Sequence, residues 1–287
     1  MTQAERRRFL IDALLAERPS CRKQDVPNDA QRQKILLRAL MNVRPPKPVS
    51  SEFLTVQDAY LRQALAEDGI TRAEDLTPVD GDLYLWQGDM TRLACGAIVN
   101  AANSGMTGCY VPNHACIDNC IHTFAGVQLR LDCAELMARQ GHEEPTGQAK
   151  ITRAYNLPCD YVLHTVGPIV TGRVTPEDER LLASCYRACL ELAEAHGVKS
   201  VAFCCLSTGV FHFPNDRAAQ IAVRTVRQYK ADGPLTRLLL PIVALDDAVG
   251  LVVFAVSFGI AKAMLSGRLS LFAVLLDPLI EIVLSLI

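Results

Sequence analysis

The sequence predicts a three-layer α/β domain with a mixed, mostly parallel sheet, preceded by a helical extension and followed by a hydrophobic tail. The 287 residues are 50% hydrophobic and 21% charged, which is enough apolar material for a packed core. Short apolar segments alternate with longer helical ones, and this alternation favours parallel strands joined by helices. At about 150 residues per domain, the length allows roughly two domains.

Charge and cysteine content indicate which partners and which cellular compartment to expect. The net charge of -2, from 29 basic and 31 acidic residues, excludes a large basic surface for nucleic acid. The first residues, MTQAERRRFL, lack the apolar core of a secretion signal, so we expect a cytoplasmic protein. The 11 cysteines are then better explained as buried or metal-bound thiols than as a disulfide framework.

Residues 1–75 are expected to form a charged helical extension. Two apolar stripes at helical spacing predict its first two helices. The stripes consist of Phe9, Leu10, Ala13 and Leu14, and of Ile35, Leu36, Leu40 and Met41. Prolines in the segment 44–48 end the second helix, and Ser50 or Ser51 begins a third. The extension either covers the core, which we favour, or serves as a lid or substrate-docking element.

The α/β domain is expected over residues 76–233. Its strands are predicted at 83–86, 97–100, 162–165 and 200–204, and its helices at 117–139, 176–196 and 216–229. Stop signals at His196-Gly197 and Asp232-Gly233 end the last two helices. Because ligands bind at the carboxyl ends of parallel strands, the chemistry is expected in the loops after Val99, Thr165 and Cys205.

The loop after the second predicted strand carries the most information. Asn100 and Asn103 supply amide donors and acceptors for hydroxyl groups. Cys109, His114 and Cys116 follow as C-x4-H-x-C, a set of soft sulfur and imidazole ligands that suits zinc. Three protein ligands leave one coordination position open, as in catalytic zinc sites. The alternative is a loop with two incidental thiols and a histidine that caps the next helix.

The loop after Cys205 contains Ser207-Thr208-Gly209 and then Phe211. Its backbone N–H groups and hydroxyls suit phosphate oxygens, and the phenyl ring suits a sugar face. On its own, however, this loop is better explained as an ordinary turn between a strand and a helix.

Several short motifs, in a common order over roughly residues 81–232, resemble the macrodomain signature. The motifs are Gly88-Asp89-Met90-Thr91, Ala97-Ile98-Val99-Asn100-Ala101-Ala102-Asn103-Ser104, Cys120-Ile121-His122 with Ala125-Gly126, Gly147-Gln148-Ala149 with Thr152, His164-Thr165-Val166-Gly167-Pro168, and Ser207-Thr208-Gly209-Val210-Phe211. The insert with Cys109, His114 and Cys116 resembles the zinc-containing macrodomain class, which occurs in microbes beside a sirtuin-like ADP-ribosyltransferase. Proteins of that class carry a helical extension before the domain.

The resemblance implies binding of ADP-ribose. Asp89 would accept from the adenine amino group, with the Met90 amide beside it. A carboxylate suits this role because the adenine amino group donates and a carboxylate only accepts. The distal ribose would lie against Asn103 and Phe211, and residues 207–210 would cradle the diphosphate. The complete implied set is Asp89, Met90, Asn100, Asn103, Cys116, Ile117, Asp118, Ser207, Thr208, Gly209, Val210 and Phe211.

The activity implied is removal of mono-ADP-ribose from a protein side chain, with an aspartate or glutamate ester as the expected linkage. Asp118 and Asn103 would be catalytic, and Asp118 would orient or deprotonate the attacking group. Zn²⁺ on Cys109, His114 and Cys116 would polarise a sugar hydroxyl or a water. The expected partners are ADP-ribose and a mono-ADP-ribosylated protein. Two alternatives stay open: Asp118 only favours the helix dipole, or the domain is a reader that binds without turnover around a structural metal.

The other thiols and one histidine are expected in the core. Five cysteines in predicted helices and strands are expected to act as small buried apolar residues: Cys133, Cys185, Cys189, Cys204 and Cys205. We favour a satisfied core histidine for His164, near the end of a predicted strand.

Residues 234–287 form the hydrophobic tail. Residues 248–261 are uncharged but shorter than the roughly 20 residues of a membrane span. The stretch PIVALDDAVGLVVFAVSFGIA resembles a helix of bacterial cation–proton antiporters, yet so short a tail cannot form a transporter. We favour a fusion or frameshifted end that leaves the sheet one edge strand short. The alternatives are pairing of 238–245 as that strand, or membrane contact through residues 238–287, which would make this a membrane-tethered interaction protein.

Overall fold

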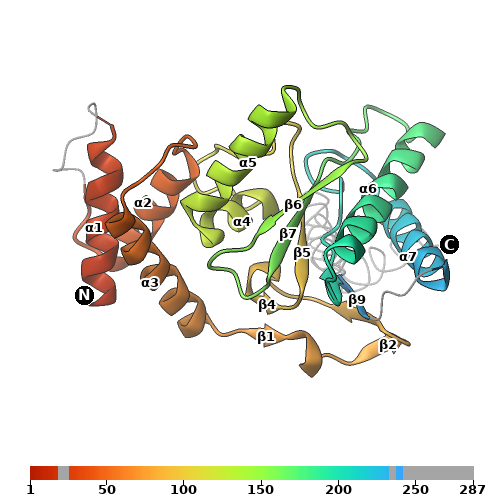
Figure 1. Cartoon of the computed structure of the whole chain (residues 1–287), viewed down its shortest axis with the longest axis horizontal. Helices are drawn as coiled ribbons and strands as arrows, with labels where there is room; N and C mark the ends of the chain where they lie inside the picture. The colour runs from red at the N-terminus through yellow and green to blue at the C-terminus, as the bar shows by residue number, and fades with distance from the viewer. Residues whose placement is uncertain (19–25, 233–236, 242–287) are drawn as a thin grey trace, which may run out of the picture. The chain divides into compact units, whose positions relative to one another are not determined.

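A computed structural model describes residues 1–18, 26–232 and 237–241 (Figure 1). It shows the predicted α/β domain with helices before it. Most of the hydrophobic tail, including the antiporter-like stretch from residue 242 onward, lies outside the described residues. Among the helices that are described, none has the length and apolar character needed to cross a membrane.

Within residues 1–18 and 26–68, three helices form the extension: α1 (Gln3–Ala16), α2 (Ala30–Asn42) and α3 (Ser51–Asp68). Of the two serines predicted to begin α3, Ser50 is the cap, since its side chain accepts from Phe53 N. The helices share a small core of their own, to which Val127 of the domain also belongs. One stripe residue was predicted wrongly: Ile35 is 50% exposed, because Leu37 takes the inward position on α2.

A short parallel pair, β1 (Thr71–Arg72) with β4 (Leu93–Ala94), follows the extension. The three α-helices of the extension therefore end at Asp68, before the predicted limit at residue 75. Three-residue helices flank this pair, η2 (Ala73–Asp75) before β2 and η3 (Met90–Arg92) before β4.

The described strands of the main sheet follow the order β2-β3-β9-β8-β5-β7-β6. Their bounds are β2 (Pro78–Asp80), β3 (Leu83–Trp86), β9 (Arg237–Pro241), β8 (Ser200–Ala202), β5 (Ala97–Ala101), β7 (Tyr161–Thr165) and β6 (Ala149–Arg153). All neighbours pair in parallel except the two edge strands, β2 and β6. The mixed, mostly parallel sheet is therefore confirmed.

Strand β9 comes from the start of the predicted tail. It pairs in parallel with β3 on one side and β8 on the other, with Leu238 opposite both Leu83 and Val201. The expectation of a sheet that lacks a strand is wrong, because the apolar residues after 236 supply one. The strand also lies inside the sheet, not at its edge.

Helices cover both faces of the sheet, with α4 (Ile117–Ala125) and α5 (Val127–Gln140) on one side and α6 (Pro176–Ala195) and α7 (Asn215–Asp232) on the other (Figure 1). The single helix predicted over 117–139 is wrong. Gly126, at φ +101°, separates α4 from α5, and a Cβ there would lie 2.6 Å from Gln57 Nε2 of α3. The predicted ends of α6 and α7 are confirmed.

The main core lies between the sheet and its two helical layers. The thiols predicted to be apolar core groups are buried at Cys133, Cys185, Cys189 and Cys204, whereas Cys205 is only half-buried. No disulfide forms among the cysteines that the structure describes.

Candidate active site

Asp118 lies in the first turn of α4, beside the carboxyl end of β5, and is only 5% exposed. Asn100 Nδ2 donates to its Oδ1 at 2.8 Å, and Asn103 Nδ2 donates to its Oδ2 at 3.4 Å. Burial raises the pKa of Asp118 to about 6, although the bond from Asn100 acts in the opposite direction. The structure thus brings together three residues that the sequence singled out. A carboxyl group oriented by two amides can accept a proton from a neighbouring group.

The turn after β5 is organised by Asn103. Its Oδ1 accepts from Gly105 N at 3.1 Å, and its Nδ2 donates to Gly108 O at 3.1 Å. The half-buried Cys116 and Ile117 directly precede Asp118 and lie at the same corner of the fold.

Cys109, His114 and Cys116 also come together. Their candidate ligand atoms all lie within 4.8 Å of one another, and Cys109 Sγ is 3.4 Å from His114 Nδ1. Tetrahedral zinc with ordinary bond lengths places a sulfur and a nitrogen ligand about 3.5 Å apart, so this pair fits. Burial raises the pKa of the Cys116 thiol to about 12, and a bound cation would oppose that shift. The alternative interpretation of this loop expected His114 to cap the next helix. The cap of α4 is instead Cys116, whose Sγ accepts from Asn119 N at 3.4 Å.

Helix α2 of the extension holds the loop that carries the three candidate metal ligands, residues 109–116, named the metal loop for these candidates. Arg38 Nη2 donates to His114 O at 2.8 Å. The fully buried Asn42 accepts from Asn113 N at 2.8 Å and donates to Thr123 Oγ1 of α4 at 2.5 Å. The extension therefore does more than cover the core: it fixes the backbone of the candidate ligands.

Arg130 of α5 binds the carbonyl groups at the end of α2. Its Nη1 donates to the carbonyl oxygens of Met41, Asn42 and Arg44 at 3.1, 2.8 and 2.6 Å. Its guanidinium also lies 4.5 Å from the centre of the Tyr110 ring in the metal loop. Sequence reasoning missed Arg130, because its partners are 86 to 89 positions away.

The phosphate-loop candidate, residues 207–211, follows β8, which neighbours β5 in the sheet. Ser207 is buried at φ +65°, and its Oγ has no hydrogen-bond partner within the described residues. Thr208 Oγ1 donates to Cys205 O at 3.0 Å, whereas Gly209 and Val210 are exposed, Val210 by 68%. A hydroxyl without a partner beside exposed backbone is suited to an anionic ligand.

The loop after β7 touches the phosphate-loop candidate. A Cβ on Gly167 would lie 2.0 Å from Ser207 Oγ, so only glycine permits this approach. Val170 N donates to Phe211 O at 2.8 Å. The loops predicted to carry the chemistry after β7 and β8 thus meet at one edge of the sheet.

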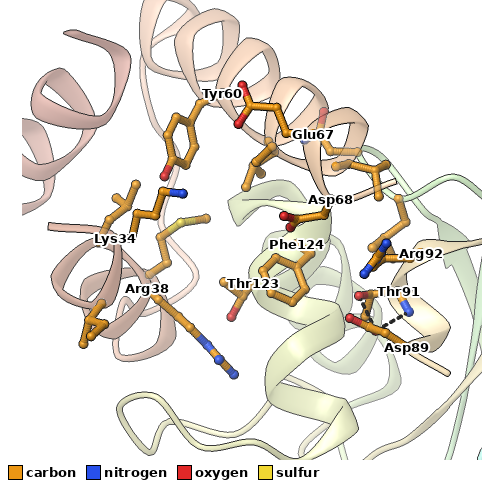
Figure 2. A pocket seen from close by; sticks show the side chains of 18 of the residues that line it. Lys34, Arg38, Tyr60, Glu67, Asp68, Asp89, Thr91, Arg92, Thr123 and Phe124 are labelled. Carbon is orange, nitrogen blue, oxygen red and sulfur yellow. Dashed lines mark hydrogen bonds between the residues drawn. The ribbon is translucent and has the colours of Figure 1, made fainter. Parts of the chain in front are cut away.

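Asp89 lines a cavity of about 450 Å³ between the extension and the domain (Figure 2). Its Oδ1 accepts from Thr91 N at 2.9 Å and Thr91 Oγ1 at 2.6 Å, and the neighbouring Met90 is buried. Figure 2 shows Phe124 of α4 and Arg38 of α2 on the same cavity, and the guanidinium carbon of Arg38 is 5.8 Å from the centre of that ring. An acceptor beside an aromatic ring is suited to an amino-substituted heterocycle.

Two buried histidines lie behind Asp118. His122 Nε2 is 3.5 Å from Asp118 Oδ1, and burial holds the pKa of His122 well below its usual range. His122, Cys133 and His164 form a second group whose ligand atoms are within 4.8 Å. His164 is the satisfied core histidine that the sequence predicted, since Asn100 and Thr152 occupy its two nitrogens. No role for His122 was inferred from the sequence, although it stands one helical turn after Asp118.

Comparison with known proteins places this geometry in a family. The family model described as Macro domain matches residues 99–222. A protein-ADP-ribose hydrolase of Treponema medium is 63% identical over 235 residues, which are 80% of this chain and 90% of that protein. A protein-ADP-ribose hydrolase of Staphylococcus aureus (strain MSSA476) is 52% identical over 223 residues, 77% and 84% of the two chains.

Solved structures agree. The Oceanobacillus iheyensis macrodomain with ADP matches with a TM-score of 0.52 and 35% identity, over 58% of this chain and 86% of that one. The Trypanosoma brucei macrodomain in complex with ADP matches with a TM-score of 0.55 and 29% identity, over 71% and 88%. The macrodomain signature, the three-layer fold and these matches agree: this chain belongs to the macro domain family.

Proposed function

We propose that this protein is a protein-ADP-ribose hydrolase that removes mono-ADP-ribose from modified protein side chains. The observation that carries the proposal is the buried Asp118, oriented by Asn100 and Asn103 next to the three candidate metal ligands. Relatives at 63% and 52% identity that bear the name of this activity support it.

The substrate would lie along the edge of the sheet formed by the carboxyl ends of its strands. Its adenine end would meet Asp89 and Phe124 at the cavity of Figure 2, and its diphosphate the hydroxyls and backbone of residues 207–210. The distal ribose would then lie between Asn103 and Phe211, close to Asp118. The free Oγ of Ser207 supports this orientation, because an oxyanion would give it a partner.

Asp118 would act on the attacking water. In the hydrolysis of an ester between ribose and an aspartate or glutamate side chain, water adds across the carbon–oxygen bond that breaks. Asp118 would orient this water and accept its proton, and the proton would pass to the departing oxygen. Its burial beside two amide donors supports this role over that of a simple helix-end charge.

Zn²⁺ would be held by Cys109, His114 and Cys116, whose spacing fits the ion. When bound, it would supply Lewis acidity at the one coordination position that three protein ligands leave open.

The test is release of ADP-ribose from an aspartate- or glutamate-modified protein, with and without a strong zinc chelator. We expect chelator-sensitive release by the wild type. Asp118→Ala should abolish turnover and leave ADP-ribose binding nearly unchanged. The control is Asp216→Ala, which removes an exposed first-turn carboxylate of α7 and should leave turnover intact.

Other outcomes contradict parts of the proposal. No release by a folded protein that still binds ADP-ribose would make the domain a reader. Release that survives chelation would remove zinc from the mechanism. Turnover by Asp118→Ala would show that Asp118 is not the base.

A further inference from the structure

A chain of buried polar side chains runs from Asp118 into the sheet. Asn100 of β5 and His164 of β7 are register partners, and Thr152 lies on the adjacent strand β6. Asn100 Nδ2 is 3.1 Å from His164 Nδ1, and His164 Nε2 is 2.9 Å from Thr152 Oγ1. Asn100 is 0% exposed and His164 is 1% exposed, so water does not compete for these bonds.

The chemistry of the hydrogen-bond partners indicates which atom carries each proton. Asn100 Nδ2 lies 2.8 Å from an Asp118 oxygen, and a carboxylate only accepts, so the amide nitrogen faces Asp118. The second N–H of this amide points to His164 Nδ1, which must therefore accept. A neutral imidazole then has its proton on Nε2 and donates it to Thr152 Oγ1. Burial lowers the pKa of His164 to about 3, in agreement with a neutral ring.

A competing acceptor for the His164 proton is weak. Cys133 Sγ lies 3.8 Å from Nε2, and burial raises the pKa of this thiol, which keeps it neutral. A neutral thiol is a poor acceptor compared with a hydroxyl. The Asn100 amide sets the tautomer by donating to Nδ1, and the Thr152 hydroxyl is the better acceptor for the proton that this leaves on Nε2.

We propose that Thr152 and His164 are positioning residues for the reaction, which hold the Asn100 amide in the orientation that supports Asp118. This inference rests on the proposed hydrolase function. With the imidazole proton on Nδ1, two donors would face each other, and the Asn100 amide would have to turn. Its oxygen would then point at the Asp118 carboxylate and repel it. Both positioning residues are buried, and the hydrogen bonds that lead from them to Asp118 pass through Asn100.

The experiment uses a matched pair at position 152. Thr152→Val keeps the shape and removes the acceptor, whereas Thr152→Ser keeps a hydroxyl. We expect Thr152→Val to lower kcat by about tenfold to a hundredfold, the effect of weakening the hydrogen bond from Asn100 to the Asp118 carboxylate. The dissociation constant for ADP-ribose should stay within about twofold, and Thr152→Ser should restore most of kcat.

A spectroscopic measurement separates positioning from a general effect on the fold. In ¹⁵N-labelled full-length protein, the imidazole nitrogens of His164 should show the Nε2–H tautomer in the wild type and in Thr152→Ser. Thr152→Val should lose or mix that tautomer. If this variant does not fold, His164→Asn, which retains an acceptor for Asn100, should keep more activity than His164→Leu.

The outcomes are distinct. A Thr152→Val variant with wild-type kcat, or an Nδ1–H tautomer in the wild type, would overturn the positioning role and leave the hydrolase intact. Equal losses of kcat and of thermal stability in both position-152 variants would show that these buried hydrogen bonds only stabilise the fold, which would overturn the positioning role. A wild type that releases no ADP-ribose would instead refute the proposed function itself.

Discussion

Two loops at the same edge of the sheet are held in opposite ways. The metal loop, residues 109–116, is fixed by side chains from distant elements, chiefly Asn42 of α2 and Arg130 of α5. The phosphate-loop candidate, residues 207–211, is held by nearby backbone: Phe213 N donates to Ser207 O at 2.9 Å, and His212 N donates to Gly209 O at 3.0 Å. One loop therefore depends on the helical extension, and the other depends mainly on its own turn and the neighbouring β7 loop.

The backbone conformations show the same contrast. The left-handed residue of the metal loop, at φ +55°, is Asn113, a residue type that tolerates this conformation. The phosphate-loop candidate has Ser207 at φ +65°, and His212 directly after it is at φ +58°. Histidine adopts this region more readily than most residue types, whereas serine does so at a greater cost. The backbone hydrogen bonds within this segment offset that local strain.

The largest effect is expected at the anchor of the extension. Arg130→Leu leaves the carbonyls at the end of α2 without their buried donor, which should lower the free energy of unfolding by about 3 kcal/mol. Urea denaturation measures this loss. The control is Arg139→Leu on the exposed face of α5, which should change stability by less than about 0.5 kcal/mol. Similar losses for both variants would contradict a special anchoring role.

A smaller change acts on the metal loop more directly. Asn42→Ala removes the acceptor for Asn113 N and the donor to Thr123 Oγ1, at an expected cost of about 2 kcal/mol in stability. Zinc-loaded protein should also lose its ion to a chelator faster than the wild type, while ADP-ribose binding to the other loop persists. Unchanged zinc release would show that the loop holds its geometry without α2.

The converse change affects only the phosphate-loop candidate. Gly167→Ala places a Cβ 2.0 Å from Ser207 Oγ and must displace that side chain. We expect about tenfold weaker ADP-ribose binding, or about 1.4 kcal/mol, measured by calorimetry, with zinc retention unchanged. The double variant Gly167→Ala with Ser207→Ala removes the clashing oxygen and should bind better than Gly167→Ala alone. Tight binding by the single variant would argue against this loop as the diphosphate site.

The smallest effect is expected where strain is local. His212→Gly relieves a left-handed residue and should raise the free energy of unfolding by about 0.5 kcal/mol, since part of the gain is offset by chain entropy. His212→Ala keeps the strained conformation and should show no gain in urea denaturation. A loss of stability in the glycine variant would mean that the imidazole makes a favourable contact.

Local sequence signals predicted the parts of the fold in which neighbours along the chain decide the structure. The cap at Ser50, the strand of residues 83–86 and the end of α6 before His196 are all confirmed. The break at Gly126 was missed because Gln57, from another helix, packs against it. The strand β9 was misjudged because the hydrophobic run that contains it is equally compatible with several environments.

The sequence by itself determined the alternation of strands and helices, and it pointed to Asn100, Asn103, Asp118 and the C-x4-H-x-C set as a site. Regular apolar spacing and short motifs are local patterns, which can be recognised from residues that are close together in the sequence. The tertiary structure alone decided that Arg38, Asn42 and Arg130 hold the metal loop, and that His164 lies opposite Asn100. These contacts join residues far apart in the chain, and a buried polar group shows its role only when its partners are known.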